Sequence, residues 1–158
     1  MAGESEQATA EAGAEAIRHY FEQRSVEPVG GDDGRFTVYV PTANGDDERL
    51  QVGLASTPVS RGVVARVKAP RRVSEDNFPA VLWLCNEWNR RNPLPRAALS
   101  VGEVDGARVG TCVLEGWLPA TAEYPEDQLT RFIDSVVSGA RSFWASARLQ
   151  DLAPVTTG

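Results

Sequence analysis

Three successive runs of alternating apolar and polar residues place the strongest constraint on the fold. RFTVYV (residues 35–40) and RLQVGL (49–54) each put apolar side chains on one face and polar ones on the other, as half-buried strands do. VSRGVVARVKA (59–69) is rich in β-branched residues, and its arginines indicate one wet face. An Asn-Gly pair between the first two runs favours a hairpin turn. Short connections of this kind predict an antiparallel meander.

The pattern becomes helical over residues 74–91, SEDNFPAVLWLCNEWNRR. Acidic residues occupy the first turn and arginines the last, which matches the helix dipole. The apolar residues cover more of the circumference than a helix packed on one side requires. Pro93 and Pro95 then end the helix, because each proline biases the residue before it toward extended geometry.

Two further strands follow, and a helix lies at each end of the pattern. RAALSV (96–101) and VGTCVLEGWL (109–118) are predicted strands, with an Asp-Gly hairpin signal between them. Amphipathic helices are predicted over about 12–24 and over 125–149. The element order α-β-β-β-α-β-β-α predicts an α+β fold in which helices pack an antiparallel sheet.

A chain of 158 residues fits one ordinary domain. We expect residues 1–12, which are small, polar and acidic, to form a disordered tail. Residues 13–149 then form the single domain, and residues 150–158 a flexible C-terminal tail. The N-terminus has no signal-peptide pattern, and no apolar run approaches the roughly 20 residues of a membrane span, so we expect a cytoplasmic protein without a membrane partner.

The charge is unevenly spread along the chain. Residues 61–96 hold eight basic and three acidic residues, which gives this segment a charge of +5. Since the net charge of the chain is −6, the other residues together carry −11. An acidic protein is a poor general binder of nucleic acid or anionic membranes, where Lys and Arg supply the affinity. The basic segment indicates either a solvated surface or a contact for an acidic partner.

The residues that could carry chemistry do not assemble into a catalytic, cofactor or metal site. The single histidine, His19, lies beside aromatic residues of the first helix. Cys85 and Cys112 fall on apolar faces, where a free cysteine behaves as a small buried hydrophobe. CxxC and HxxxH spacings are absent, as are the glycine-rich phosphate patterns. We therefore expect no enzyme activity, no cofactor and no metal.

The corner that follows the helix 74–91 needs its own explanation. Asn86 and Asn89 lie three residues apart and so share a helix flank. Their amides can bind the backbone of the NPLP corner, which Pro95 closes. We predict a structural role for these three residues.

The motif residues of this region are Leu84, Asn86, Trp88 and Asn89, then Pro95, Arg96, Ala97 and Leu99, then Asp105-Gly106. With them, the chain from about Phe78 to Trp144 resembles the YbjN family. The resemblance implies the fold of type III secretion chaperones, which are small, acidic, usually dimeric bacterial proteins with a C-terminal amphipathic helix. The sequence PATAEYPED (119–127) departs from the Gly-Gly-like turn that family members often have there, so contacts of that turn are not carried over.

The sequence therefore favours a non-enzymatic, chaperone-like or regulatory module that binds protein. Tryptophan and arginine are preferred at the centres of interfaces. We expect a homodimer formed through the helix 74–91 and adjoining strands, which binds an unidentified protein or peptide client. The candidate contact residues are Val81, Trp83, Leu84, Trp88, Arg66 and Trp117. Two alternatives stay open: an accessory subunit of a peptide-modifying enzyme complex, and a nucleic-acid-binding regulator that uses residues 61–96.

Overall fold

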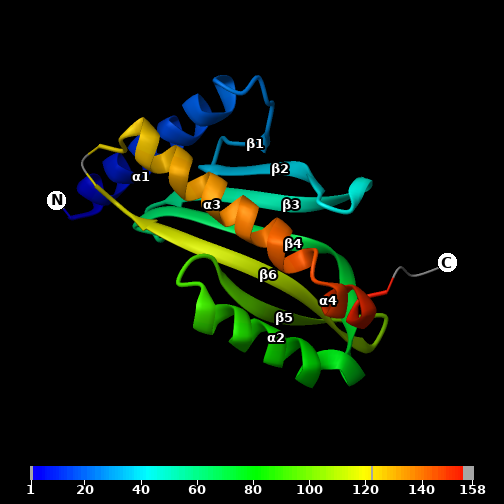
Figure 1. Cartoon of the computed structure of the whole chain (residues 1–158). Coiled ribbons are helices and arrows are strands. Elements are labelled where there is room, and N and C mark those ends of the chain that lie inside the picture. Colours follow the sequence, from blue (N-terminus) through cyan, green and yellow to red (C-terminus); the bar gives the residue numbers. More distant parts are fainter. Residues whose placement is uncertain (1, 122, 155–158) are drawn as a thin grey trace.

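The computed structural model describes residues 2–121 and 123–154. Its elements follow the predicted order and confirm the α+β class, with a two-residue strand, a 3-10 turn and a short C-terminal helix in addition. The elements are α1 (Ala2–Glu22), β1 (Val29–Gly30), β2 (Arg35–Thr42), β3 (Gly45–Thr57), β4 (Gly62–Ser74), η1 (Glu75–Asn77), α2 (Phe78–Arg91), β5 (Arg96–Val104), β6 (Ala107–Pro119), α3 (Glu126–Trp144) and α4 (Ala147–Leu152) (Figure 1).

The strands form one antiparallel sheet in the order β1-β2-β3-β4-β6-β5. The predicted meander is β2, β3 and β4, and Gly45 at the first hairpin has a φ of 137°, which favours glycine. β6 pairs with β4, and this pairing leaves β5 at one edge of the sheet. The register shifts once in β4, between Lys68 and Arg72.

One face of this sheet is the core. Opposite residues of an antiparallel ladder lie on the same face, so a single rung can be followed across the sheet. Val38, Val52, Val67, Leu114 and Ala97 form one such rung from β2 to β5. The last four of these side chains are buried, as the period-two pattern predicts.

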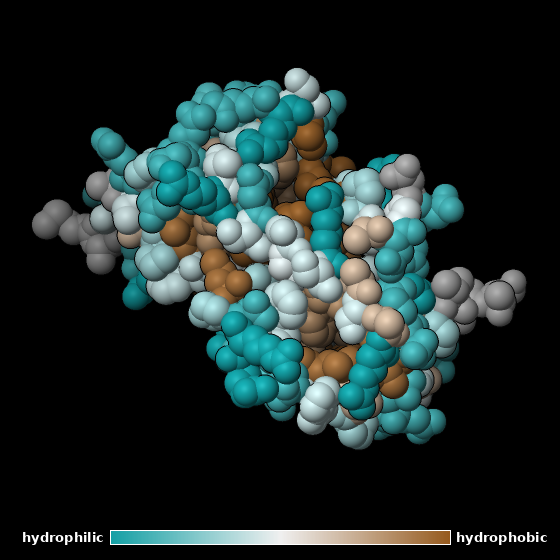
Figure 2. Space-filling view, viewed as in Figure 1, coloured by the Kyte–Doolittle hydropathy of each residue, from teal (hydrophilic) through white to brown (hydrophobic). Residues whose placement is uncertain are grey.

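All four helices contribute to the buried cluster on this face. In Figure 1, α3 crosses in front of β3, β4 and β6, α1 lies beside its N-terminal half, and α2 runs along β5. Seen from the helix side, the apolar surface gathers in gaps between helices, one of them above α3 (Figure 2). The described part of the chain places no helix on the opposite face of the sheet, which we call the open face.

The expected disordered tail over residues 1–12 is wrong for residues 2–12, which form the first turns of α1. Ala10 and Ala14 are buried because small side chains let the helix approach β3 closely. Ser56 Oγ donates to Ala10 O at 3.0 Å. A Cβ on Gly13 would lie only 2.1 Å from Ser56 Oγ. The composition that resembles a disordered segment is therefore a close-packing surface.

The expected flexible tail over residues 150–158 is likewise wrong where the structure describes it. Residues 147–152 form α4, and Leu149 and Ala153 are fully buried. Arg71 donates to Ala153 O at 2.6 Å, and Asn77 Nδ2 donates to Leu152 O at 3.1 Å. Residues 155–158 lie outside the described residues.

Candidate functional site

The predicted contact residues do not form one surface. Trp83 lies on the outer face of α2, whereas Arg66 and Trp117 lie on the open face of the sheet. Val81 has no exposed surface, so including it in a contact surface is wrong. The stripe that contains Val81 faces the core, because α2 packs onto β5 and β6 rather than standing away from the sheet. Leu84 is half-buried beside it.

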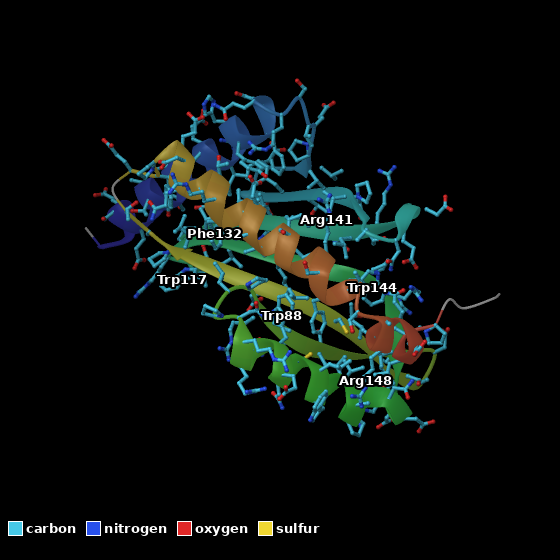
Figure 3. The ribbon with its side chains drawn as sticks, viewed as in Figure 1. Trp88, Trp117, Phe132, Arg141, Trp144 and Arg148 are labelled. Atoms are coloured by element: carbon cyan, nitrogen blue, oxygen red, sulfur yellow. The ribbon has the colours of Figure 1, made fainter. Side chains whose placement is uncertain are left out.

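Trp88 belongs to the corner between α2 and β5. Its indole Nε1 donates to Pro95 O at 2.9 Å, and its ring packs edge-to-face on Phe143, with the centroids 5.5 Å apart. Figure 3 shows Trp88 between α2 and the strands. Pro95 is buried, follows a cis peptide bond and lies against Gly139 of α3. These contacts give Trp88 a structural role and leave only part of it accessible.

Asn89 ties the same corner to the edge strand. Its Nδ2 donates to Ala97 O at 2.9 Å, and Ala97 N donates to its Oδ1 at 2.7 Å. The side-chain amide thus pairs with both backbone groups of Ala97, as a neighbouring strand would. Asn86 differs: its side chain is exposed and makes no hydrogen bond within residues 2–121 and 123–154.

The cysteines are poor candidates for a nucleophile. Cys85 and Cys112 are both buried. Burial raises the pKa of Cys85 to about 11 and that of Cys112 to about 12, and the neighbouring Cys85 adds to the second shift. Both thiols are therefore protonated at neutral pH, and a protonated thiol is a weak nucleophile.

His19 lies on the exposed surface of α1, among Gln23, Glu22 and Glu126. It therefore does not contact either buried thiol, and a Cys-His pair is not formed. Among the described residues, no group of three or more possible metal ligands comes together. No helix in that part of the chain is long and apolar enough to cross a membrane.

The open face is strongly basic. The register places three successive rungs on it: Arg35–Ala55–Val64–Trp117, Thr37–Gly53–Arg66–Glu115–Arg96, and Tyr39–Gln51–Lys68–Val113–Ala98. Arg72 pairs with Thr111 on the same face. Arg49, which pairs with Pro41, lies two residues before Gln51 in β3 and therefore also faces this side. The ladder-paired positions of this face thus hold one acid, Glu115, and six cations, which are Arg35, Arg49, Arg66, Lys68, Arg72 and Arg96.

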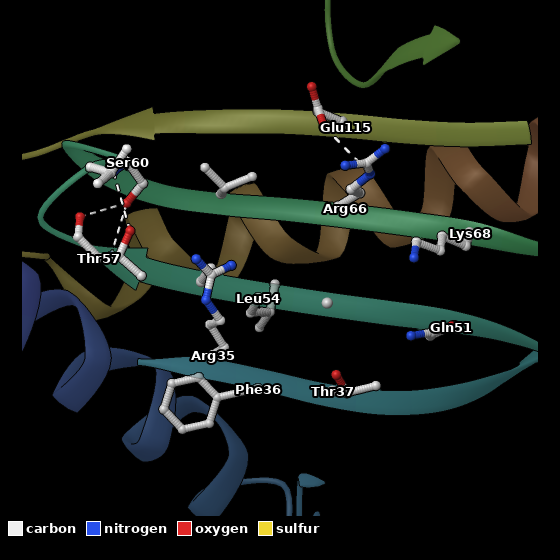
Figure 4. A pocket seen from close by; sticks show the side chains of 14 residues that line it. Arg35, Phe36, Thr37, Gln51, Leu54, Thr57, Ser60, Arg66, Lys68 and Glu115 are labelled. Carbon is white, nitrogen blue, oxygen red and sulfur yellow. Dashed lines mark hydrogen bonds and ion pairs between the residues drawn. The ribbon is translucent and has the colours of Figure 1, made fainter. Parts of the chain in front are cut away.

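The face is hollowed over β2, β3 and β4, with a volume of about 410 Å³ (Figure 4). Arg66 pairs loosely with Glu115 at 3.8 Å, and Arg35 with Asp33 at 3.7 Å. Lys68 has no ion pair with any described residue. Gly53 lies in the floor of the hollow, and a Cβ there would meet nothing closer than Arg66 O at 3.6 Å. The hollow is therefore accessible and has an excess of positive charge.

Trp117 stands on the same face, next to the hollow. It is 54% exposed, yet its Nε1 donates to Ser60 O at 2.9 Å. Ser60 is itself fixed in the β3–β4 turn by hydrogen bonds with Thr57 and Gly62. A large aromatic side chain held in place while exposed to solvent is a typical anchor for a binding partner.

The charge distribution follows from the register rather than from the segment 61–96 alone. The ladder-paired positions of the open face carry +5 and the rest of the molecule −11. The basic segment 61–96 already contained Arg66, Lys68, Arg72 and Arg96, whereas Arg35 and Arg49 lie outside it and were missed. The signal was present as cations at alternate positions of the strands, but only the pairing of the strands brings them together.

A second, smaller apolar surface lies on α2. Leu82 is 47% and Trp83 51% exposed there. The guanidinium of Arg148, from α4, lies 4.8 Å from the centre of the Trp83 ring, in cation–π geometry. The helix α2 as a whole packs along the edge strand β5, where Val101 is also exposed.

Comparison with known proteins identifies one family and one fold. The family model "YbjN: Putative bacterial sensory transduction regulator" matches residues 13–147. The chain is also similar to a solved structure described as "Crystal structure of YbjN, a putative transcription regulator from E. coli", with a TM-score of 0.63 and 10% sequence identity. That likeness covers 89% of this chain and 95% of the other, and at such low identity it establishes the fold alone. No curated protein matches the sequence.

Proposed function

The chain belongs to the YbjN family, and on that premise we propose that it is a regulatory protein that acts by binding an acidic segment of a partner protein on the open face. The observation that carries the proposal is the gathering of six cations and the exposed Trp117 on one uncovered sheet face of an acidic protein. The family's description as a regulator supports a binding role.

An extended acidic peptide fits this face better than a second copy of the same face. Two open faces brought together would oppose +5 with +5, which like-charge repulsion disfavours. A contact between the open face of one copy and an acidic region of the next is heterologous, so it leads to a ring or a filament and not to a twofold dimer. An acidic segment of a different protein avoids both the like-charge repulsion and the assembly into rings or filaments.

Nucleic acid is the competing ligand, because phosphates would also seek these cations and bases could stack on Trp117. The charge of −11 outside the open face argues against it. A polyanion long enough to extend beyond the face meets an acidic surface, whereas a short acidic peptide ends within it. Nucleic-acid binding through residues 61–96 is therefore kept as one possible outcome of the test.

The test uses a fluorescently labelled peptide in which glutamate alternates with valine, and its glutamine counterpart. We expect the glutamate peptide to bind, and to bind less tightly as salt rises from about 0.05 M to about 0.5 M. Lys68→Glu should weaken binding about tenfold, since a rim contact is both removed and reversed. Arg131→Glu on α3 makes the same change in net charge away from the face and is the control; the Arg131 side chain is 81% exposed and, among the described residues, pairs only with Asp127 on its own helix.

Equal binding of both peptides, or an equal loss from Lys68→Glu and Arg131→Glu, would contradict the proposal. Tighter binding of a labelled oligothymidine than of the glutamate peptide would replace it with nucleic-acid binding. A chaperone-like action on a bound client is a finer form of the same proposal and requires a natural client, which tagged pull-down from the native cell can supply.

We further propose that the chain forms a homodimer through the outer face of α2. Leu82 and Trp83 are its exposed apolar residues, and the helix α2 packs along the edge strand β5. A twofold axis at this place would cover both the apolar side chains and the free edge. Light scattering after size exclusion should give twice the chain mass of 17.1 kDa, and Trp83→Glu should return the monomer. A monomer of wild-type protein at high concentration would refute the dimer and leave the open-face proposal untouched.

A further inference from the structure

A second hollow, of about 530 Å³, lies on the helix side between the end of α1, the free half of β2 and α3 (Figure 2). It exists because β1 pairs only with Phe36 and Thr37, so nothing extends the sheet beyond the rest of β2. Val38 and Val40 share rungs with the buried Val52 and Leu50, yet they remain only half-buried. Core-facing positions are thus left accessible.

The walls of this hollow are mainly apolar. Val26 stands at its edge with 42% of its surface exposed. The apolar lining comes from α1, β2, β3 and α3 and from the segment after α1, through Phe21, Val26, Val38, Val40, Val52, Leu54, Ile133 and Val137. A cavity of this size with apolar walls and few polar groups is typical of sites for small molecules.

One of the two arginines in the lining is already neutralised. The guanidinium of Arg24 lies 3.8 Å from the centre of the Tyr20 ring and pairs with Asp134 at 3.5 Å. The Tyr20 hydroxyl donates to the same carboxylate at 2.8 Å. These three groups satisfy one another and leave no net charge for a ligand.

Arg141 is different. It extends from α3 toward β2, where its Nε donates to Pro41 O at 3.1 Å (Figure 3). Its side chain is half-buried, and within the described ranges it has no ion pair and no hydrogen bond from its terminal nitrogens. The Nε contact fixes the direction of the guanidinium while its two outer nitrogens remain available.

We propose that this hollow binds a small molecule that has an apolar body and one carboxylate. The body lies against Val38, Val40 and Val137, and the carboxylate accepts hydrogen bonds from the two terminal nitrogens of Arg141. The pairing of a planar guanidinium with a carboxylate is bidentate and geometrically selective. Because the hollow lies on the opposite side of the sheet from the open face, this site goes beyond the proposed function and does not depend on it.

Decanoate and decanol, both below their aggregation concentrations, are matched probes that differ only in the charged group. Isothermal titration calorimetry on the wild-type protein should show saturable, one-site binding of decanoate. Decanol should bind about tenfold more weakly or worse, as expected when a charge-assisted hydrogen bond is absent. Arg141→Gln should lower decanoate affinity to that of decanol and leave decanol unchanged.

Two variants fill the hollow independently: Val40→Phe from β2 and Val137→Phe from α3. Each should abolish decanoate binding, whereas Val101→Phe, on the far edge of the sheet, should leave it intact. Circular dichroism melting verifies that each variant folds. If one of the two filling variants does not fold, the other still tests the site. Lys68→Glu on the open face should not change decanoate affinity, so the two proposals fail separately.

The proposal is overturned by any of three results. These are failure of decanoate to saturate a single site on the wild-type protein, binding of decanol as tight as that of decanoate, and decanoate binding that persists in a folded Val40→Phe or Val137→Phe variant. Loss of the difference between decanoate and decanol in Arg141→Gln, together with loss of binding in a folded filling variant, supports it.

Discussion

Replacing Asn89 by alanine removes both hydrogen bonds that connect α2 to the edge strand. Ala97 N and Ala97 O then lose their partners, although Ala97 is only 5% exposed. An orphaned buried backbone group costs roughly 1–3 kcal/mol. Alanine's better helix propensity recovers about 0.5 kcal/mol. We therefore expect Asn89→Ala to lower the free energy of unfolding by about 2–4 kcal/mol.

Urea denaturation followed by circular dichroism measures this loss directly. For a domain of this size it corresponds to a fall in Tm of about 5–15 °C, from roughly 2–4 °C for each kcal/mol. Asn86→Ala is the matched control, because it removes the same amide three residues earlier, where the side chain is exposed and makes no described contact. The control should stay within about 0.5 kcal/mol of wild type. Equal effects of the two substitutions, or no effect of Asn89→Ala, would refute the role given to Asn89.

Four further outcomes are expected from the same structure. Trp88→Phe keeps an aromatic ring in the corner but loses the indole hydrogen bond, and should cost about 1 kcal/mol in urea denaturation. The raised pKa values of Cys85 and Cys112 mean that the folded state favours the protonated thiols. Their contribution to the free energy of unfolding is therefore complete below pH 9 and declines as the pH rises toward about 11. A free energy of unfolding that does not fall over this range would contradict the burial of the two thiols. For the same reason a thiol reagent at pH 8 should label neither cysteine until the protein is unfolded. Gly53→Glu should fold normally and reduce binding of the glutamate peptide more than Gly53→Gln does, because both occupy the floor of the hollow and only one adds a negative charge.

Periodicity predicted the strands and their buried faces, because a side chain's face is decided locally by its position in the pleat. It did not predict the first turns of α1, whose small residues are buried only through contact with a strand some 40 residues away, at Ser56. The two asparagines show the same difference between what the local sequence predicts and what contacts with distant residues decide. Asn86 and Asn89 share a helix flank, but only Asn89 lies in the last turn, where the chain returns as β5 and brings Ala97 within reach.

The candidate site depended still more on pairing between strands. Arg35, Arg66 and Lys68 are separated along the chain, and no local pattern relates the first to the other two. The β2–β3–β4 register places them on one face, and a shift of one residue in any strand would have sent that strand's cation to the core side. Composition could give the size of the charge imbalance, but only the register could give its location.

Amide chemical-shift mapping tests the central claim most directly. The protein, labelled with nitrogen-15, is titrated with the glutamate–valine peptide, and the perturbed backbone amides are assigned to elements. The largest shifts are expected in β2, β3, β4 and β6 around Lys68 and Trp117, and they should disappear in Lys68→Glu. Shifts confined to α2 and β5, or to the hollow between α1 and α3, would contradict the assignment of the open face as the surface that binds the partner.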